Sequence, residues 1–294
     1  MNSNRFNRIL WLLCSLLFFI RTSPGQQATS FKSFQIARDS ALIAHKLIFV
    51  TFQNEDTKLM GRVRSANLSK FQSANGTMKG LPCLNFNPPW YLARNALLLF
   101  VPYDAEPYLR KKYASEDKTA LVLDAFGNEL YAEVCPGIDK LTQILKSLPE
   151  DASTYYSLLK NLSEHPDSLD LKLSLADLCQ LYRATTASNK YYNEIAESRD
   201  FKKDTTLSDH VQSRLALNAY ANGDYDKAED LLSDHIKDFP HSQERPMQLF
   251  LLTSISVIKK HKDDATHYWQ MLQTEFPNNE HTNLAKTLID QYIK

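Results

Sequence analysis

Glycine is scarce in this sequence, with 7 residues in 294. Phosphate-binding loops and turn-dense all-β folds both need repeated glycine, so the sequence argues against both. The four cysteines contain no C-x-x-C pair, and the short motifs of serine hydrolases, zinc proteases and nucleotide-binding proteins are also missing. These absences remove most enzyme classes that carry a recognisable sequence motif.

Neither sign of charge is in excess, because 34 Lys and Arg residues balance 34 Asp and Glu residues. Binding to nucleic acid or to an anionic membrane normally requires a basic excess, so the composition predicts neither. Hydrophobic residues make up 43% of the chain and charged residues 23%, which is typical of a folded globular protein. The length is sufficient for two domains of ordinary size.

The first 25 residues have the layout of a secretory signal. Arg5 and Arg8 precede an apolar run over 9–20, and Ser23 then begins a short stretch of small residues. The run is too short to span a bilayer comfortably as a permanent helix. We therefore predict a signal peptide over 1–25, no stable membrane span after its removal, and export to a periplasm or the exterior. Retention of this segment as an anchor is the alternative.

The following segment, up to about residue 148, alternates between helix and strand. Continuous apolar runs over 46–52, 96–101 and 119–123 are typical of strands buried on both faces of a sheet. A fourth strand is expected over 130–134, and turn residues before it predict a hairpin. Helices are expected over 34–44 and 138–148.

This order, with a hairpin near the end and a final helix, resembles the thioredoxin fold over about residues 32–148. The run KLIFVTF at 46–52 is similar to the first central strand of that family. The stretch 113–124, with the Phe-Gly-Asn-Glu that follows it, resembles the family's segment of aromatic residue, cis-proline, strand and D-x-x-G turn. Gly137 stands where thioredoxins have a glycine before the last helix. The resemblance implies an α/β thioredoxin-like domain over 26–148.

The catalytic part of that family's pattern is missing. Residues 53–60 contain no cysteine where thioredoxins place C-x-x-C, and Lys118 replaces the expected cis-proline. Dithiol–disulfide exchange needs an activated thiolate, so we predict a redox-inactive module without a cofactor. The alternative is a divergent thiol-disulfide oxidoreductase that uses Cys83 or Cys135, and a bridge between these two cysteines stays open.

From residue 149 to 294 the sequence is helical and repeats itself. The segment 218–240, with Leu215-Ala216 before it, resembles one tetratricopeptide repeat (TPR). A shift of 37 residues aligns three large-small pairs, Leu178-Cys179, Leu215-Ala216 and Leu252-Thr253. The resemblance implies an all-α array of TPR-like repeats, with a leading helix near 152–165 and a closing helix near 280–293.

A TPR-like array implies binding of a protein or peptide along its first helices. We predict that Arg214, Asn218 and Tyr182 contact this partner, and that Trp90 in a Pro-Pro-Trp loop forms a second recognition edge. Packing of Trp90 back against its own domain is the alternative. Cys179 is expected to serve close packing of helices.

His235 and His241 lie six residues apart, so they do not share a helical face as metal ligands would. We expect both to be solvated residues at helix ends. Together these observations predict an exported, non-catalytic binding or scaffold protein without metal or cofactor. A structural subunit of an envelope complex is a further alternative.

Overall fold

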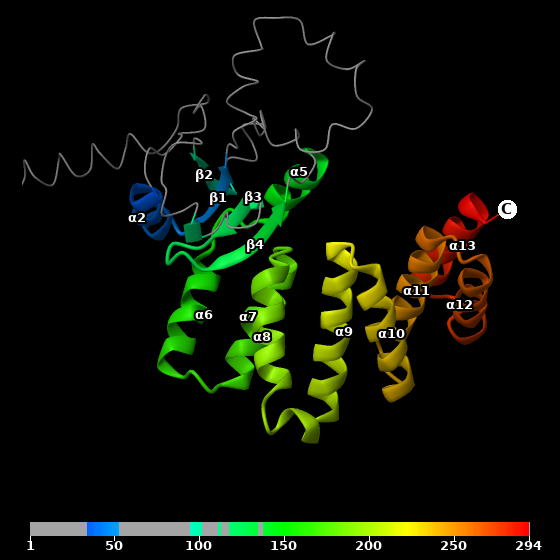
Figure 1. The fold of residues 1–294 in the computed structure, drawn as a ribbon. Helices are drawn as coiled ribbons and strands as arrows, with labels where there is room; N and C mark the ends of the chain where they lie inside the picture. Colours follow the sequence, from blue (N-terminus) through cyan, green and yellow to red (C-terminus); the bar gives the residue numbers. More distant parts are fainter. Residues whose placement is uncertain (1–33, 53–94, 102–110, 113–117, 135–137, 294) are drawn as a thin grey trace, which may run out of the picture.

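A four-stranded sheet stands at one end of the molecule, and a row of helices leads away from it (Figure 1). The computed structural model describes residues 34–52, 95–101, 111–112, 118–134 and 138–293. The sheet region contains α2 (Phe34–Ala44), β1 (Leu47–Phe52), β2 (Ala96–Val101), β3 (Lys118–Leu123), β4 (Glu129–Val134) and α5 (Ile138–Ser147). The row consists of α6 (Ser153–Glu164), α7 (Leu169–Leu181), α8 (Thr185–Ala196), α9 (Thr205–Asn222), α10 (Tyr225–Asp238), α11 (Arg245–Lys259), α12 (Lys262–Glu275) and α13 (Glu280–Tyr292).

These bounds confirm the four predicted strands and the predicted helices to within about two residues. Within the sheet, the strands lie side by side in the order β2-β1-β3-β4. β1 pairs with β2 in parallel, so that Leu47 lies opposite Ala96, and it pairs with β3 in antiparallel fashion. The side chains of Ile48, Val50 and Leu121 are fully buried, which explains why the strand sequences lack polar alternation.

The predicted hairpin is formed by β3 and β4, which pair in antiparallel fashion. Its turn depends on the Asp124 carboxylate, which accepts hydrogen bonds from the backbone amides of Phe126 and Asn128, both at 2.8 Å. Aspartate commonly holds turns in this way. Gly127 adopts a left-handed conformation with φ of 82°, which a glycine tolerates without steric cost.

The array is made of helical hairpins that turn at residues in the left-handed conformation: Arg183, Gly223 and Lys260. After each of them, a backbone amide donates to a carbonyl five residues earlier, which is the hydrogen bond of a Schellman motif. These equivalent bonds join Ala184 to Cys179, Asp224 to Ala219 and His261 to Ser256, at 2.8, 3.0 and 2.8 Å. The repeats are therefore 40 residues apart at the first step and 37 at the second.

The uniform 37-residue spacing predicted from the sequence is thus right for the second step and wrong for the first. Cys179 is equivalent to Ala219, not to Ala216. The physical reason lies in α9, which has 18 residues where α11 has 15, and whose extra turn is at its N-terminal end. A longer connection, containing the 3-10 turn Phe201–Lys203, leads into this extra turn.

One hydrophobic core joins the sheet to the first helices of the array. A single cluster of buried side chains runs from Ala37 in α2 to Val211 in α9, across the domain boundary predicted after residue 148. Tyr155 of α6 donates to the buried Asp124 carboxylate at 3.1 Å. Its neighbour Tyr156 accepts from the Ala125 amide at 3.0 Å and donates to the Lys46 carbonyl at 2.8 Å. The leading helix of the array is therefore bonded directly to the hairpin turn.

Several sequence predictions fall outside the described residues: the signal segment 1–25, the Trp90 loop, Cys83 and Cys135. Among the described helices, none combines the length and apolarity needed to cross a membrane.

Candidate functional site

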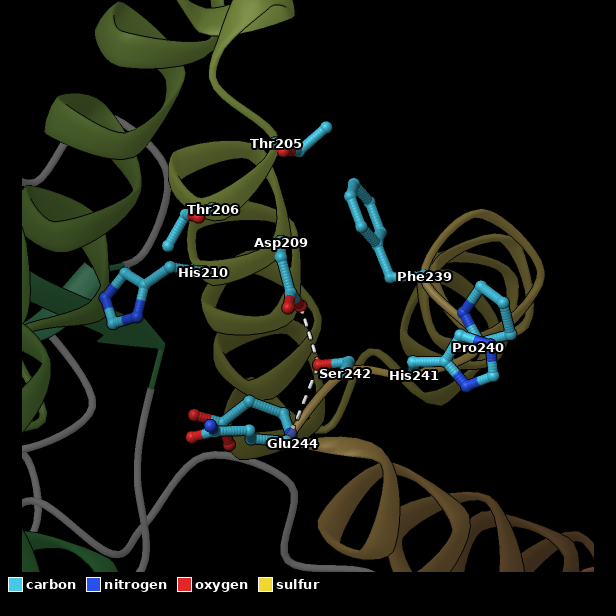
Figure 2. Close-up of a pocket in the computed structure, with 10 residues that line it drawn as sticks. Thr205, Thr206, Asp209, His210, Phe239, Pro240, His241, Ser242 and Glu244 are labelled. Atoms are coloured by element: carbon cyan, nitrogen blue, oxygen red, sulfur yellow. Dashed lines mark hydrogen bonds between the residues drawn. The ribbon is translucent and has the colours of Figure 1, made fainter.

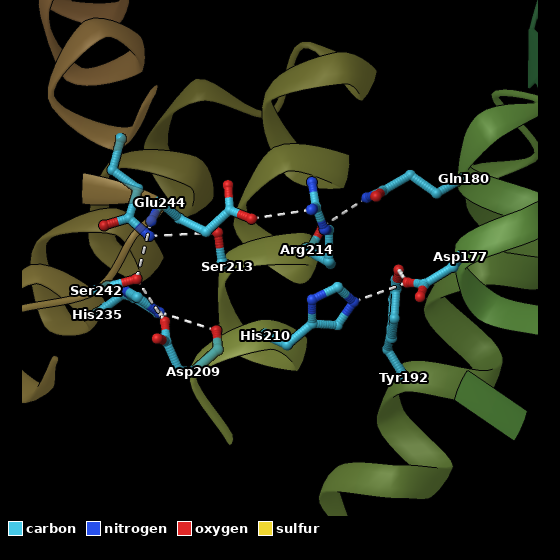
Figure 3. Close-up of polar contacts among 11 residues, drawn as sticks. Asp177, Gln180, Tyr192, Asp209, His210, Ser213, Arg214, His235, Ser242 and Glu244 are labelled. Carbon is cyan, nitrogen blue, oxygen red and sulfur yellow. Dashed lines mark hydrogen bonds and ion pairs between the residues drawn. The ribbon is translucent and has the colours of Figure 1, made fainter. Parts of the chain in front are cut away.

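Helix α9 lies in the middle of the array and is bonded by side chains to α7 on one side and to α11 on the other (Figure 3). Gln180 of α7 donates to the Arg214 carbonyl at 3.1 Å and to the Asn218 side chain at 2.9 Å. On the other side, Gln248 of α11 donates to Ser213 at 3.2 Å. The first helices of three successive hairpins therefore form one connected layer.

Asn218, predicted as a partner-binding residue, is buried within this layer, with 1% of its surface exposed. Its amide nitrogen donates to Ser188 at 3.0 Å and to Asn189 at 2.8 Å, while its oxygen accepts from Gln180. A buried amide needs hydrogen-bond partners, and Asn218 finds them on α7 and α8. The side chain thus joins α7, α8 and α9. This placement gives Asn218 a role in holding the helices together.

Tyr182 is also largely buried, and its carbonyl accepts a hydrogen bond from Ser147 at the end of α5, at 2.9 Å. This bond fixes the α7–α8 turn against the sheet region. Arg214 differs, because a quarter of its side chain is exposed. Its guanidinium pairs with Glu244 of the α10–α11 connection at 2.9 Å. Of the predicted partner-binding residues that the structure describes, Arg214 is the one that solvent reaches.

Asp177 of α7 forms a second polar cluster with α8 and α9. Its Oδ1 accepts from the Tyr192 hydroxyl at 2.5 Å and lies 2.9 Å from His210 Nε2. Burial alone would raise the pKa of Asp177, but the hydrogen bonds from His210 and Tyr192 outweigh it and lower the pKa. Burial, with the bond to Asp177, raises the pKa of Tyr192. The Asp177 carboxylate therefore stays ionised at neutral pH and ties three helices together by hydrogen bonds.

Asp209, His235 and Ser242 form a third cluster, between α9, α10 and the loop after α10. His235 Nε2 and Ser242 Oγ lie 2.9 and 2.7 Å from Asp209 Oδ1. His235 is fully buried, so the expectation of a solvated residue is wrong. The reason is that α10 turns this position toward α9, which supplies a carboxylate. Ser242 bonds the carboxylate and not the imidazole, so the serine-to-base contact of a hydrolase is missing from this cluster.

A cavity of about 490 Å³ opens beside these clusters, between the start of α9 and the α10–α11 connection (Figure 2). The extra turn of α9 forms one of its walls. Its lining therefore depends on the 40-residue step described above. The lining residues are Thr205, Thr206, Asp209, His210, Phe239, Pro240, His241, Ser242, Gln243 and Glu244. Sequence reasoning missed this cavity, because the 40-residue step on which its lining depends has no clear mark in the sequence.

Metal and thiol chemistry find no support in the part of the chain that the structure describes. No group of three His, Cys, Asp or Glu residues there is placed to hold a metal ion. Burial, and then the nearby Asp124, raises the pKa of the Cys179 thiol to about 12, so this thiol stays protonated at neutral pH. Its fully buried position agrees with the packing role predicted from the sequence.

Comparisons of this chain with protein family models, with curated proteins and with solved structures find no match. The features that bear on a role are the partly exposed Arg214–Glu244 pair and the cavity beside it.

Proposed function

We propose that this chain is an exported, non-catalytic binding protein that holds another polypeptide on its helical array. The observation that carries the proposal is the cavity at the start of α9, flanked by the partly exposed pair of Arg214 and Glu244. Arg214 lies on α9 and Glu244 in the connection that leads into α11, and α9 and α11 are bonded to one another, so the surface exists before a partner arrives. Binding to a preformed surface avoids the entropy cost of ordering it.

A TPR-like identity for the array is part of this proposal, and the helix crossings support it. Ser188, Ala228 and Ala265 occupy equivalent positions in the second helices of the hairpins, and all three are fully buried. Small side chains at such positions let neighbouring helices approach closely. The same proposal treats the N-terminal region as a thioredoxin-like module without redox activity, supported by the parallel β1–β2 pair and the β3–β4 hairpin before α5.

The alternative, a thiol-disulfide oxidoreductase, depends on Cys83 or Cys135, which both lie outside the described residues. Thiol-dependent turnover by the purified chain, lost when both cysteines are changed to serine, would establish it. Export is proposed from the signal-like N-terminus, and the mature protein should then begin at Gln26. Terminal sequencing of the protein from its own cell tests this start.

Photo-crosslinking in the cell tests the binding function with the full chain. A photoreactive residue replaces Gln243, which is exposed at the cavity, and in a matched variant it replaces Gln270, which is exposed on α12. Both positions are exposed glutamines of the helical array, so the two variants differ mainly in location.

We expect a discrete adduct with another polypeptide from position 243 and none from position 270. Mass spectrometry then identifies the adduct. If position 243 gives no adduct, or if both positions give the same products, the cavity face of the array is not the binding element.

A further inference from the structure

The cavity is lined by acidic side chains and by no lysine or arginine. Asp209 and Glu244 are carboxylates, whereas none of its ten lining residues is a lysine or an arginine. Arg214 lies next to the cavity, but its guanidinium is paired with Glu244. The lining thus has two carboxylates and no ammonium or guanidinium group. Such a lining favours a cationic ligand over an anionic one.

Each carboxylate keeps one oxygen for a ligand. Asp209 Oδ1 accepts from Ser242 and lies 2.9 Å from His235 Nε2, which is also hydrogen-bonded to the Asp209 carbonyl. Glu244 Oε1 accepts from Arg214. Among the described residues, neither Asp209 Oδ2 nor Glu244 Oε2 has a hydrogen bond or an ion pair. The two side chains are 27% and 28% exposed, so they are partly shielded from solvent and still reachable. A charge-assisted hydrogen bond at such a place is stronger than one on an open surface.

An aromatic ring completes the lining. Phe239, the C-cap residue that follows α10, lines the cavity, and Figure 2 shows its side chain across from His210 with Asp209 between them. Its ring also contacts His235, at 4.9 Å between centroids, which holds it in place. Aromatic faces attract ammonium and guanidinium groups, and the apolar stems of lysine and arginine pack along apolar surface of this kind.

We propose that this cavity binds a lysine or arginine side chain of the partner polypeptide, with Asp209 and Glu244 as acceptors for its charged head and Phe239 against its stem. The volume of about 490 Å³ accommodates a long side chain together with its hydration water. The proposal rests on the polypeptide-binding function proposed above and names the chemistry that the site recognises.

The test uses the full chain with histidines labelled for NMR and short blocked peptides as probes. The peptides are Ac-Ala-Arg-Ala-NH₂ and Ac-Ala-Lys-Ala-NH₂, with the glutamine and glutamate analogues for comparison. His210 and His241 line the cavity, and His235 contacts two of its lining residues, so the other five histidines of the chain serve as internal references. We expect saturable shifts of His210 and His241 with the basic peptides alone. High salt should weaken these shifts, because it screens the charges.

Two substitutions test whether the basic peptides bind in the cavity. Glu244→Gln removes a lining charge and should weaken binding of the arginine peptide about tenfold or more, as the loss of a charge-assisted hydrogen bond predicts. Glu275→Gln is the matched control, because it breaks the comparable pair with Arg245, at 2.7 and 3.0 Å, away from the cavity. It should leave the affinity unchanged.

A second variant checks the site by filling it. Thr206→Trp, on the exposed first turn of α9, should abolish the histidine shifts, whereas Thr287→Trp, exposed on α13, should not.

Equal shifts with the glutamine peptide, or no shift at tens of millimolar peptide, would overturn this proposal. A crosslinked partner at position 243 would still support polypeptide binding in that case, so the two proposals fail separately.

Discussion

At the scale of single residues, the fold depends on buried polar side chains whose hydrogen bonds are satisfied. Asp124 is fully buried, and its carboxylate is bonded by Tyr155 and by the side chain of Asn128, at 3.1 and 2.7 Å. Asn218 plays a comparable part between three helices. Removing one partner from such a group costs more than an average surface contact, because the remaining group stays desolvated.

Tyr155→Phe is expected to destabilise the protein by about 1–3 kcal/mol, because it leaves the buried Asp124 carboxylate with one donor fewer. Urea unfolding followed by circular dichroism measures the difference. Tyr292→Phe removes a hydroxyl from a side chain that is 58% exposed and should change stability by less than about 0.5 kcal/mol. Equal effects from the two substitutions would contradict the role given to Asp124.

Cys179 is expected to resist thiol reagents in the native protein. Burial raises its pKa to about 12, so the reactive thiolate is rare at pH 8 and the sulfur is also inaccessible. In a chain with Cys14, Cys83 and Cys135 changed to serine, we expect no labelling by a thiol reagent until denaturant is added. Rapid labelling without denaturant would show that the α7–α8 packing opens readily.

At the scale of elements, the left-handed turns decide where each hairpin of the array begins and ends. Only one of the three turn positions is a glycine, Gly223, whereas Arg183 and Lys260 adopt the same conformation with a side chain. This conformation is costly for residues other than glycine, by roughly 1–2 kcal/mol. The turns therefore differ in stability although their hydrogen bonds are equivalent.

Gly223→Ala should lower the free energy of unfolding by about 1 kcal/mol, because the added Cβ meets no atom within 4 Å and only backbone strain opposes it. Lys260→Gly should raise the free energy of unfolding by up to about 1 kcal/mol, since it relieves the same strain at the next turn. The midpoints of urea unfolding should therefore shift in opposite directions for the two variants. Destabilisation by both substitutions would show that the Lys260 side chain contributes more than its conformation costs.

The positions of the helices and strands could be predicted well from the sequence, whereas the alignment of the helical repeats was predicted less well. The apolar runs of β1, β2 and β3 were recognisable because strands buried on both faces need no polar alternation. The 40-residue step was missed because Arg183 carries no sequence mark of a left-handed turn. Asn218 was predicted to face a partner because the sequence shows that the residue is polar. It does not show which neighbouring helices bury the side chain and bond to it. The cavity was missed for the same reason as the 40-residue step.

At the scale of the whole molecule, the sheet and the start of the array share their core. The cluster from Ala37 to Val211 includes residues of both regions, and the hydrogen bonds of Tyr155 and Tyr156 cross between them. Two smaller clusters continue the packing, one around α9 to α11 and one around α11 to α13. Each part of the molecule is thus supported by its neighbour.

A fragment of residues 149–294 is therefore expected to be less stable than the chain from Gln26. Its Tyr155 and Tyr156 would lose the sheet that buries them and the groups they bond. We expect a lower thermal midpoint and binding of a hydrophobic dye by the fragment, and a single unfolding transition for the longer chain. Identical midpoints for the fragment and the longer chain would show that the array folds without the sheet.

Because the core is shared, ligand binding in the helical array should alter hydrogen exchange in the sheet, although the sheet does not contact the ligand. A ligand present at a hundred times its dissociation constant stabilises the native state by about 2.7 kcal/mol. Where unfolding is cooperative, this stabilisation extends to every amide that exchanges only through global opening. The amides of β1, which pair on both sides within the sheet, would then exchange with solvent roughly a hundredfold more slowly when the cavity at α9 is occupied. Hydrogen exchange in the strand becomes a remote measure of occupancy in the helices.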